Sequence, residues 1–96
     1  MKPIIDISFW QTPLQINYDV LAEAVSGVIL RAAYGTGKDI HFEQHYAEFA
    51  ARDVPVGAYH YIIGSQNIKA QADNFKTFTA GKELKLGRWM DVEDTR

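Results

Sequence analysis

The feature that most constrains this sequence is the repeated alternation of strand-like and helix-like segments along its 96 residues. Residues 3–7, 27–35, 55–63 and 87–93 are short apolar runs of the kind that form buried strands, and apolar residues at helical spacing follow each of the first three. Strands and helices that alternate through short connections predict right-handed βαβ units and a parallel sheet. No linker divides the segments. We therefore expect one α/β domain spanning residues 1–96.

The helical segments carry start and stop signals. Asn17 offers a side-chain oxygen that can cap the first helix, Pro55 follows the second, and Gly81 is placed to end the third. The expected apolar stripes are Tyr18, Leu21, Ala22 and Val25, then Phe42, Tyr46 and Phe49, and finally Ile68, Ala72, Phe75 and Thr79.

Composition excludes several classes of function. The formal net charge is -2 and the basic residues are scattered, so the sequence favours neither nucleic acid nor an anionic membrane as a partner. With no cysteine, the chain has no disulfide, no thiolate nucleophile and no cysteine-based zinc site. No apolar segment is long enough to span a membrane, and the N-terminus does not read as a secretory signal.

Parallel sheets place ligand sites at the carboxyl ends of their strands. Side chains able to bind ligands or transfer protons gather at those predicted ends: Asp6, Ser8, Arg31, Tyr59, Tyr61, Asp91 and Glu93.

Asp91 and Glu93 form the most informative pair. Alternation along a strand would place both carboxylates on one face, with their Cα atoms roughly 6 to 7 Å apart. Two carboxylates at that spacing suit a glycosidase, in which one carboxyl acts as an acid and the other stays ionised to stabilise positive charge. The alternative is an acidic strand end that lies in solvent.

Asp6 lies between Ile5 and Ile7 on the first strand, where an isolated charge is costly unless it faces a polar cleft. It could instead pair with Arg31 on the neighbouring strand. The two interpretations are compatible, because an arginine beside several carboxylates lowers the pKa of some while burial raises that of another.

Aromatic residues accompany these charges. Tyr59 and Tyr61 share one face of the third strand, and Trp10 follows the first strand. Aromatic rings stack on the apolar faces of sugars and their polar groups bond sugar oxygens, so all three are candidate sugar contacts. Core packing is the alternative for each.

Two further motifs are weaker. "GTGKD" resembles a phosphate-binding loop, but Ala32 and Asp39 replace its first glycine and its final Ser or Thr. His41 and His45 are spaced like a zinc pair, yet Phe42 replaces the glutamate that should follow the first histidine. We expect these histidines on a solvated helix face, and we expect neither a metal site nor a cofactor.

Five strings in order, "IDISFWQ", "GVILRAAYGTGKD", "PVGAYHY", "QADNF" and "WMDVED", resemble glycoside hydrolase family 25. These are lysozymes that cut the glycan of bacterial cell walls, and many are phage endolysins. The resemblance implies an irregular, TIM-like β/α barrel. It also implies an N-acetylmuramidase that cleaves the β-1,4 bond between N-acetylmuramic acid and N-acetylglucosamine and is bacteriolytic.

The resemblance also assigns residue roles. It implies that Asp6, Asp91 and Glu93 are catalytic, with Glu93 as general acid and base and Asp91 assisting the substrate's acetamido group as it attacks the anomeric carbon. Contacts to the substrate are expected from Arg31, Tyr59, Tyr61 and Trp10.

Family members are about twice as long, so the resemblance implies that this chain corresponds to the N-terminal half of the barrel. Such a half exposes a strand edge and apolar surface, which predicts a homodimer or a complex with a C-terminal half. The expected substrate is bacterial peptidoglycan, reached from the cytoplasm as in phage or prophage enzymes, or by another secretion route. The alternatives are a non-catalytic peptidoglycan-binding module and an inactive truncated fragment.

Overall fold

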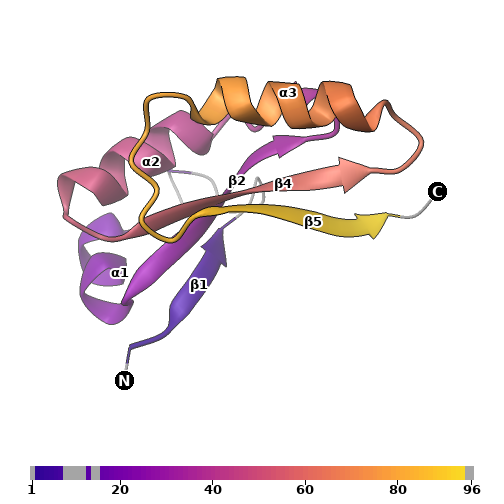
Figure 1. Cartoon of the computed structure of the whole chain (residues 1–96). Helices are drawn as coiled ribbons and strands as arrows, with labels where there is room; N and C mark the ends of the chain where they lie inside the picture. Colours follow the sequence, from indigo (N-terminus) through magenta and orange to yellow (C-terminus); the bar gives the residue numbers. More distant parts are fainter. Residues whose placement is uncertain (1, 8–12, 14–15, 95–96) are drawn as a thin grey trace.

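The structure is a computed structural model that describes residues 2–7, 13 and 16–94 (Figure 1). Strands and helices alternate as the sequence predicts. In chain order they are β1 (Ile4–Ile7), α1 (Tyr18–Ala24), β2 (Gly27–Tyr34), β3 (Gly37–Lys38), α2 (Phe42–Ala51), β4 (Val56–Ile63), α3 (Ile68–Thr79) and β5 (Arg88–Asp94).

One sheet organises the chain, with strand order β1-β2-β4-β5 and every neighbouring pair parallel. This confirms the predicted α/β fold with a parallel sheet. The short strand β3 was not predicted, and it pairs antiparallel with the end of β2. The Gly-Thr-Gly segment does more than end β2, because Gly35 has a φ of 58° and lets the chain reverse in a tight turn.

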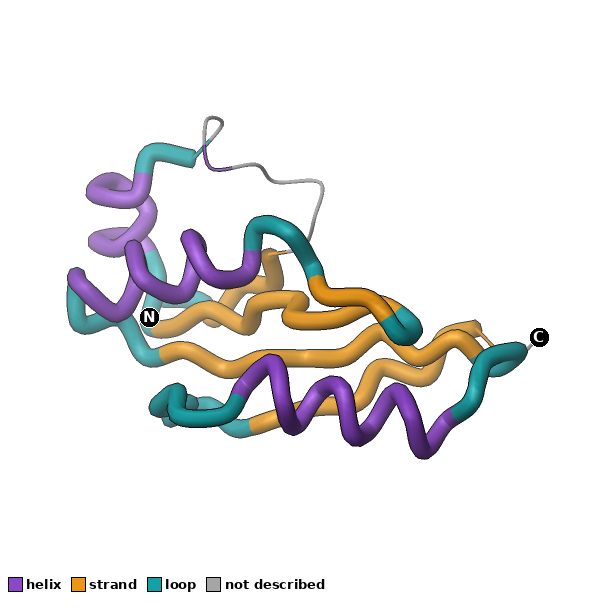
Figure 2. Tube along the Cα trace, turned by 90° about the horizontal axis from the view of Figure 1, so that it is seen from above, coloured by secondary structure: helices purple, strands orange, loops and turns teal. Residues whose placement is uncertain are grey.

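The three helices cover a single face of the sheet (Figure 1), and Figure 2 shows α2 and α3 lying over the strands. The core between these layers contains Val28, Leu30 and Ala58 from the strands and Phe42 and Phe49 from α2, all fully buried. Parallel sheets are normally covered on both faces. Within the described residues no helix covers the second face, and none is long and apolar enough to cross a membrane.

Helix ends follow the predicted signals, whereas one apolar stripe does not. Asn17 caps α1 by accepting a hydrogen bond from the Val20 amide at 3.2 Å. In α3 the expected core residue Ile68 is exposed, and Gln71 occupies a fully buried position instead. Gln71 is buried because its side chain pairs with backbone groups at the end of β4. Its Oε1 accepts a hydrogen bond from the Ile63 N–H at 2.9 Å, and its Nε2 donates to the Ile63 carbonyl oxygen at 2.8 Å.

Candidate active site

An open depression of about 500 Å³ lies on the sheet face that no described helix covers. Its walls combine two carboxylates with aromatic and apolar side chains from all four parallel strands. The lining residues are Asp6, Ile29, Tyr59, Trp89, Met90 and Asp91.

The strand register explains why these residues meet. Asp6 is aligned with Ile29 of β2, Tyr59 of β4 is aligned with Trp89 of β5, and Asp91 comes two residues after Trp89. Residues two apart on a strand face the same side of a sheet. Of the predicted catalytic residues, the structure therefore places Asp6 and Asp91 in one depression, together with Tyr59.

Tyr59 is half-buried between the charged groups of this depression. Burial raises the pKa of its hydroxyl to about 12; Arg31 opposes this rise, while the negative charges of Asp6 and Asp91 add to it. The hydroxyl therefore keeps its proton at neutral pH and can donate a hydrogen bond to a ligand.

Arg31 pairs with a residue that the sequence reasoning missed. Its Nε donates to Oδ2 of Asp39 at 2.9 Å, and the Asp39 side chain is almost completely buried. Oδ1 of Asp39 accepts a further hydrogen bond from the backbone N–H of His41 at 2.9 Å. The β2-β3 hairpin thus returns Asp39 to the side of Arg31, while the ion pair that we considered between Arg31 and Asp6 stays a prediction.

Glu93 lies in β5, and its side chain is outside the described part of the structure. The pairing between β4 and β5 shifts near it: Tyr61 is aligned with Asp91, but Ile63 is aligned with Asp94. β5 therefore has one more residue than β4 over this stretch, as in a β-bulge. Because a bulge interrupts alternation, the argument that Asp91 and Glu93 share a face stays a prediction.

The two tyrosines of β4 have different surroundings. Tyr59 lines the depression, whereas the ring of Tyr61 stacks on Tyr34, with centroids 5.7 Å apart and an interplanar angle of 26°. Tyr34 is half-exposed at the end of β2 and was not among the predicted site residues. Trp10 and Ser8 lie outside the described residues.

His41 precedes α2 and His45 lies within it, and the two do not form the solvated helix face that we expected. His45 is buried, and its Nδ1 is 2.8 Å from the hydroxyl of Tyr18, because α1 packs against this side of α2. Among the residues that the structure describes, no three His, Cys, Asp or Glu side chains come together in a way that could hold a metal ion.

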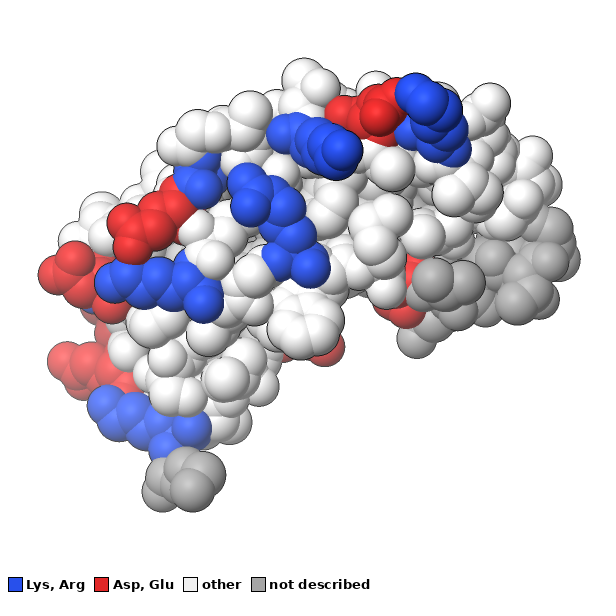
Figure 3. All heavy atoms as spheres, in the orientation of Figure 1, with Lys and Arg blue, Asp and Glu red and all other residues white. Residues whose placement is uncertain are grey.

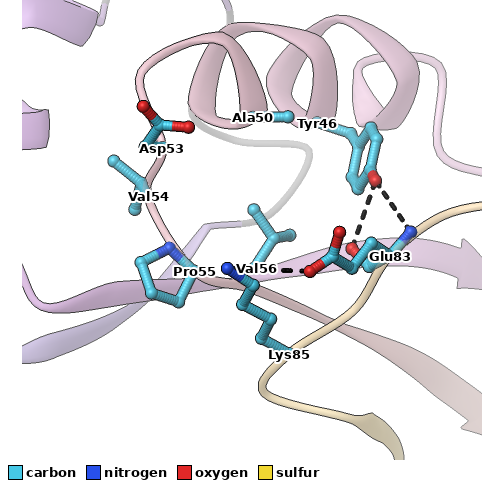
Figure 4. A pocket seen from close by; sticks show the side chains of 8 residues that line it. All are labelled: Tyr46, Ala50, Asp53, Val54, Pro55, Val56, Glu83 and Lys85. Carbon is cyan, nitrogen blue, oxygen red and sulfur yellow. Dashed lines mark hydrogen bonds and ion pairs between the residues drawn. The ribbon is translucent and has the colours of Figure 1, made fainter.

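A second, smaller pocket of about 80 Å³ lies at the opposite end of the sheet, where β4 begins (Figure 4). The hydroxyl of Tyr46 donates to the carbonyl oxygen of Glu83 at 3.1 Å and accepts from the N–H of Glu83 at 2.9 Å. These bonds tie α2 to the connection between α3 and β5, so this pocket has a structural explanation. Its lining is Tyr46, Ala50, Asp53, Val54, Pro55, Val56, Glu83 and Lys85.

Charged side chains of both signs lie on the face drawn in Figure 3. Figure 3 shows Lys and Arg side chains spread over the visible face, several of them beside acidic residues. Ion pairs such as Lys82 with Glu43 and Lys69 with Asp73, both at 2.9 Å, account for part of this pattern. The view therefore agrees with the scattered basic residues noted in the sequence.

Among protein families, the sequence model for glycosyl hydrolases family 25 matches residues 5–96. No curated protein sequence matches.

Solved structures of similar fold include GHIP, a glycosyl hydrolase 25 of Streptococcus pneumoniae described as a virulence factor that participates in host cell invasion. It is 36% identical with a TM-score of 0.87, over 97% of this chain and 46% of that one. The catalytic domain of an endolysin from a bacteriophage of Listeria monocytogenes is 25% identical with a TM-score of 0.71, over 100% and 51% of the two chains. A family 25 glycosyl hydrolase from Bacillus anthracis, 19% identical with a TM-score of 0.83 over 96% and 42%, shows the same fold. The chain thus spans about half the length of these relatives.

Proposed function

Because this chain belongs to glycosyl hydrolase family 25, we propose that it supplies the carboxylates of a peptidoglycan hydrolase. The specific reaction is that of an N-acetylmuramidase, or lysozyme, which hydrolyses the β-1,4 bond between N-acetylmuramic acid and N-acetylglucosamine. The observation that carries this proposal is the depression in which Asp6, Tyr59 and Asp91 meet at one face of a parallel sheet. Residues 1–96 then form the N-terminal half of a lysozyme-type catalytic barrel.

The first step of the proposed mechanism breaks the glycosidic bond. Glu93, as the general acid, donates its proton to the bridging oxygen as the bond from that oxygen to the anomeric carbon breaks. The acetamido oxygen of the same muramic acid unit attacks the anomeric carbon and forms a cyclic oxazolinium ion. Asp91 accepts a hydrogen bond from the acetamido N–H and stabilises the positive charge that develops there.

The second step restores the enzyme. The Glu93 carboxylate takes a proton from water as the water oxygen attacks the anomeric carbon, and the bond to the acetamido oxygen breaks. Two displacements at one carbon retain its configuration. The protonated hydroxyl of Tyr59 donates a hydrogen bond to the bound sugar, Asp6 adds negative charge beside the cationic intermediate, and Arg31, Tyr61 and Trp10 supply further contacts.

The proposed substrate and location follow the same reasoning. The substrate is bacterial peptidoglycan, so the protein acts at the cell wall after release from the cytoplasm, as phage and prophage enzymes do, or after secretion by another route. Full activity requires cover on the open face, from a second copy or from a polypeptide equivalent to the C-terminal half of the relatives. Without that cover the 96-residue chain should hydrolyse cell walls poorly, since water is not excluded from half of the cleft.

The decisive experiment compares wild type with Glu93→Gln, each tested as the 96-residue chain and as a fusion to the C-terminal half of a family 25 relative. Cell-wall turbidity reports lysis, and mass spectrometry of the released muropeptides identifies the bond that is cut. Glu93→Gln should reduce the rate of the fused protein by about 10²- to 10⁴-fold, the usual contribution of a general acid. Glu83→Gln, on an exposed residue at the other end of the sheet, is the matched control and should keep full activity. Full activity from a purified 96-residue monomer would contradict the requirement for a second polypeptide on the open face of the sheet.

A second candidate is a non-catalytic peptidoglycan-binding module. The observation that favours it is that the chain keeps the tyrosines of β4 while spanning about half the length of its relatives. In that case the chain would bind cell walls, Glu93→Gln would bind equally well, and no muropeptide would be released even from the fused protein.

A further inference from the structure

Tyr34 is held at the carboxyl end of the sheet by a distortion of β2. The pairing of β2 with β4 shifts between Arg31 and Ala33, and Ala32 and Ala33 are both fully buried. Strict alternation from Arg31 would place Tyr34 on the opposite face from Arg31. With the extra residue, Tyr34 is aligned with Tyr61 and its ring stacks on the Tyr61 ring. β-Bulges commonly re-aim a side chain beside an active site.

The backbone that follows Tyr34 is tightly anchored although the ring itself is 50% exposed. Gly35 packs so closely that a Cβ there would meet the side-chain oxygen of Gln66 at 2.5 Å. Hydrogen bonds hold both Gly35 and the residue after it. They run from Gly35 N–H to the Tyr61 carbonyl (2.9 Å), from His60 Nε2 to the Gly35 carbonyl (2.7 Å), from Thr36 N–H to Gln66 Oε1 (3.1 Å) and from Asn74 Nδ2 to the Thr36 carbonyl (3.0 Å).

The stacked rings lie beside the carboxylates. Tyr61 is aligned with Asp91 on β5, so Tyr34, Tyr61 and Asp91 occupy one row across three neighbouring strands. Two strand spacings of about 4.8 Å separate the backbone of Tyr34 from that of Asp91 by roughly 10 Å, a distance that one or two sugar units can span. The guanidinium of Arg31 lies 5.2 Å from the centre of the Tyr34 ring, and its ion pair with Asp39 fixes its position.

We propose that Tyr34 and Tyr61 form an aromatic platform that binds an N-acetylhexosamine unit next to the one held at the carboxylates. The inference rests on the proposed function for the identity of its ligand. An exposed, flat ring on a preorganised backbone can stack against the apolar face of a pyranose with little loss of entropy. A purely structural role for Tyr34 would be the stacking with Tyr61 that stabilises the β2-β4 pairing.

The test measures binding of tri-N-acetylchitotriose and of purified, insoluble cell walls to the 96-residue chain by calorimetry and by sedimentation. Tyr34→Ala should weaken binding of the soluble oligosaccharide by about 3- to 10-fold, the range expected for the loss of one aromatic stacking contact. Tyr34→Phe keeps the ring and should bind within about twofold of wild type. Ile40→Ala removes a side chain that is 76% exposed in the neighbouring loop, and this matched control should not change binding.

A second variant and a direct probe separate binding from folding. Tyr34→Leu keeps apolar volume without a flat ring, and it should bind as weakly as Tyr34→Ala while its thermal unfolding stays close to that of Tyr34→Phe. Saturation transfer from the Tyr34 ring to the sugar protons should also be visible in the wild-type chain.

The outcomes distinguish this inference from the proposed function. Equal binding by wild type, Tyr34→Ala and Tyr34→Leu would overturn the platform, whereas release of muropeptides that depends on Glu93 would still support the hydrolase. Binding that depends on Tyr34, without any hydrolysis by the fused protein, would support the platform and overturn the hydrolase. A wild-type chain that binds neither the oligosaccharide nor cell walls would overturn the platform, and the release of muropeptides by the fused protein would still decide on the hydrolase.

Discussion

His60 faces the helices from β4 and is fully buried there. Its Nε2 donates to the carbonyl oxygen of Gly35 at 2.7 Å, and its ring packs edge-on against Phe75. Nδ1 has no hydrogen-bond partner among the described residues. A protonated imidazole would place a second N–H donor in this buried position, and burial lowers the pKa of His60 below its ordinary 6.5 by more than the Gly35 carbonyl and the Gln71 side chain raise it.

Folding stability should therefore decrease in acid. In the folded chain the pKa of His60 is lower than in the unfolded chain, so below about pH 6.5 the unfolded state binds more protons and is favoured as the pH falls. His60→Gln keeps a donor for Gly35 without the titrating ring. Urea unfolding midpoints measured between about pH 8 and pH 5 should fall more steeply for wild type than for His60→Gln. Parallel pH profiles of the two proteins would show that His60 does not contribute to the pH dependence of stability.

The ion pair between Arg31 and Asp39 gives a second prediction. The Asp39 side chain is 1% exposed and that of Arg31 14%, so Asp39→Asn leaves a positive charge poorly solvated. We expect the free energy of unfolding to fall by about 2 kcal/mol, less than the 3–5 kcal/mol typical of a fully buried pair because Arg31 keeps some contact with water. Chemical denaturation measures this change. Asp73→Asn in the exposed pair with Lys69 is the matched control, and an equal loss there would contradict the argument.

At the scale of elements, local patterns predicted the helices and the four parallel strands, because apolar spacing and end signals act within a few residues. Strand β3 and the two register shifts were missed, since they depend on how strands pair. The same limit applies to the site. Asp6 and Asp91 could be found from the rule for strand ends, whereas Tyr34 reaches the row of Tyr61 only through a bulge.

The connection into β5 lies against a glycine of β4, and this gives a prediction for an element. A Cβ on Gly57 would lie 3.0 Å from Cβ of Leu86 and 3.2 Å from the carbonyl oxygen of Gly87. Gly57→Ala should therefore push the connection away and lower the free energy of unfolding by about 1–3 kcal/mol. A Cβ on Gly37 meets only the Tyr34 carbonyl oxygen at 3.6 Å, an ordinary contact. Gly37→Ala should change stability by less than about 0.5 kcal/mol in the same urea titration. Similar losses from both variants would refute the packing argument.

At the scale of the whole molecule, apolar side chains lie on the sheet face opposite the helices. Trp89 is 55% exposed in β5, and Ile4, two residues before Asp6 in β1, is 54% exposed. β5 is also an outer strand of the described sheet. The exposed sheet face and open strand edge were predicted from the length of family members. No local pattern predicted them, because the residues of one strand do not indicate whether its second face is covered.

Association with another polypeptide should bury these exposed apolar side chains. Each 100 Å² of apolar surface left in water costs about 2.5 kcal/mol at 25 cal/mol per Å², so burying the exposed Trp89 and its apolar neighbours favours association. We expect a symmetric dimer, or a complex with a C-terminal barrel half, that buries the face carrying Ile29 and Trp89. Light scattering at micromolar concentration measures the mass. In a Trp10→Phe background, the emission of Trp89 should move to shorter wavelength as the complex forms.

Matched isoleucine variants locate the interface. Ile29 lines the open depression on the uncovered face, so Ile29→Asp places a charge where the partner must dock and should shift the chain toward monomer. Ile40 is exposed in the loop between β3 and α2, away from that depression, so Ile40→Asp adds the same charge and should leave the mass unchanged. The interface would lie elsewhere if both variants dissociated equally. A wild-type chain that stays a folded monomer at micromolar concentration would mean that water, rather than protein, covers this face.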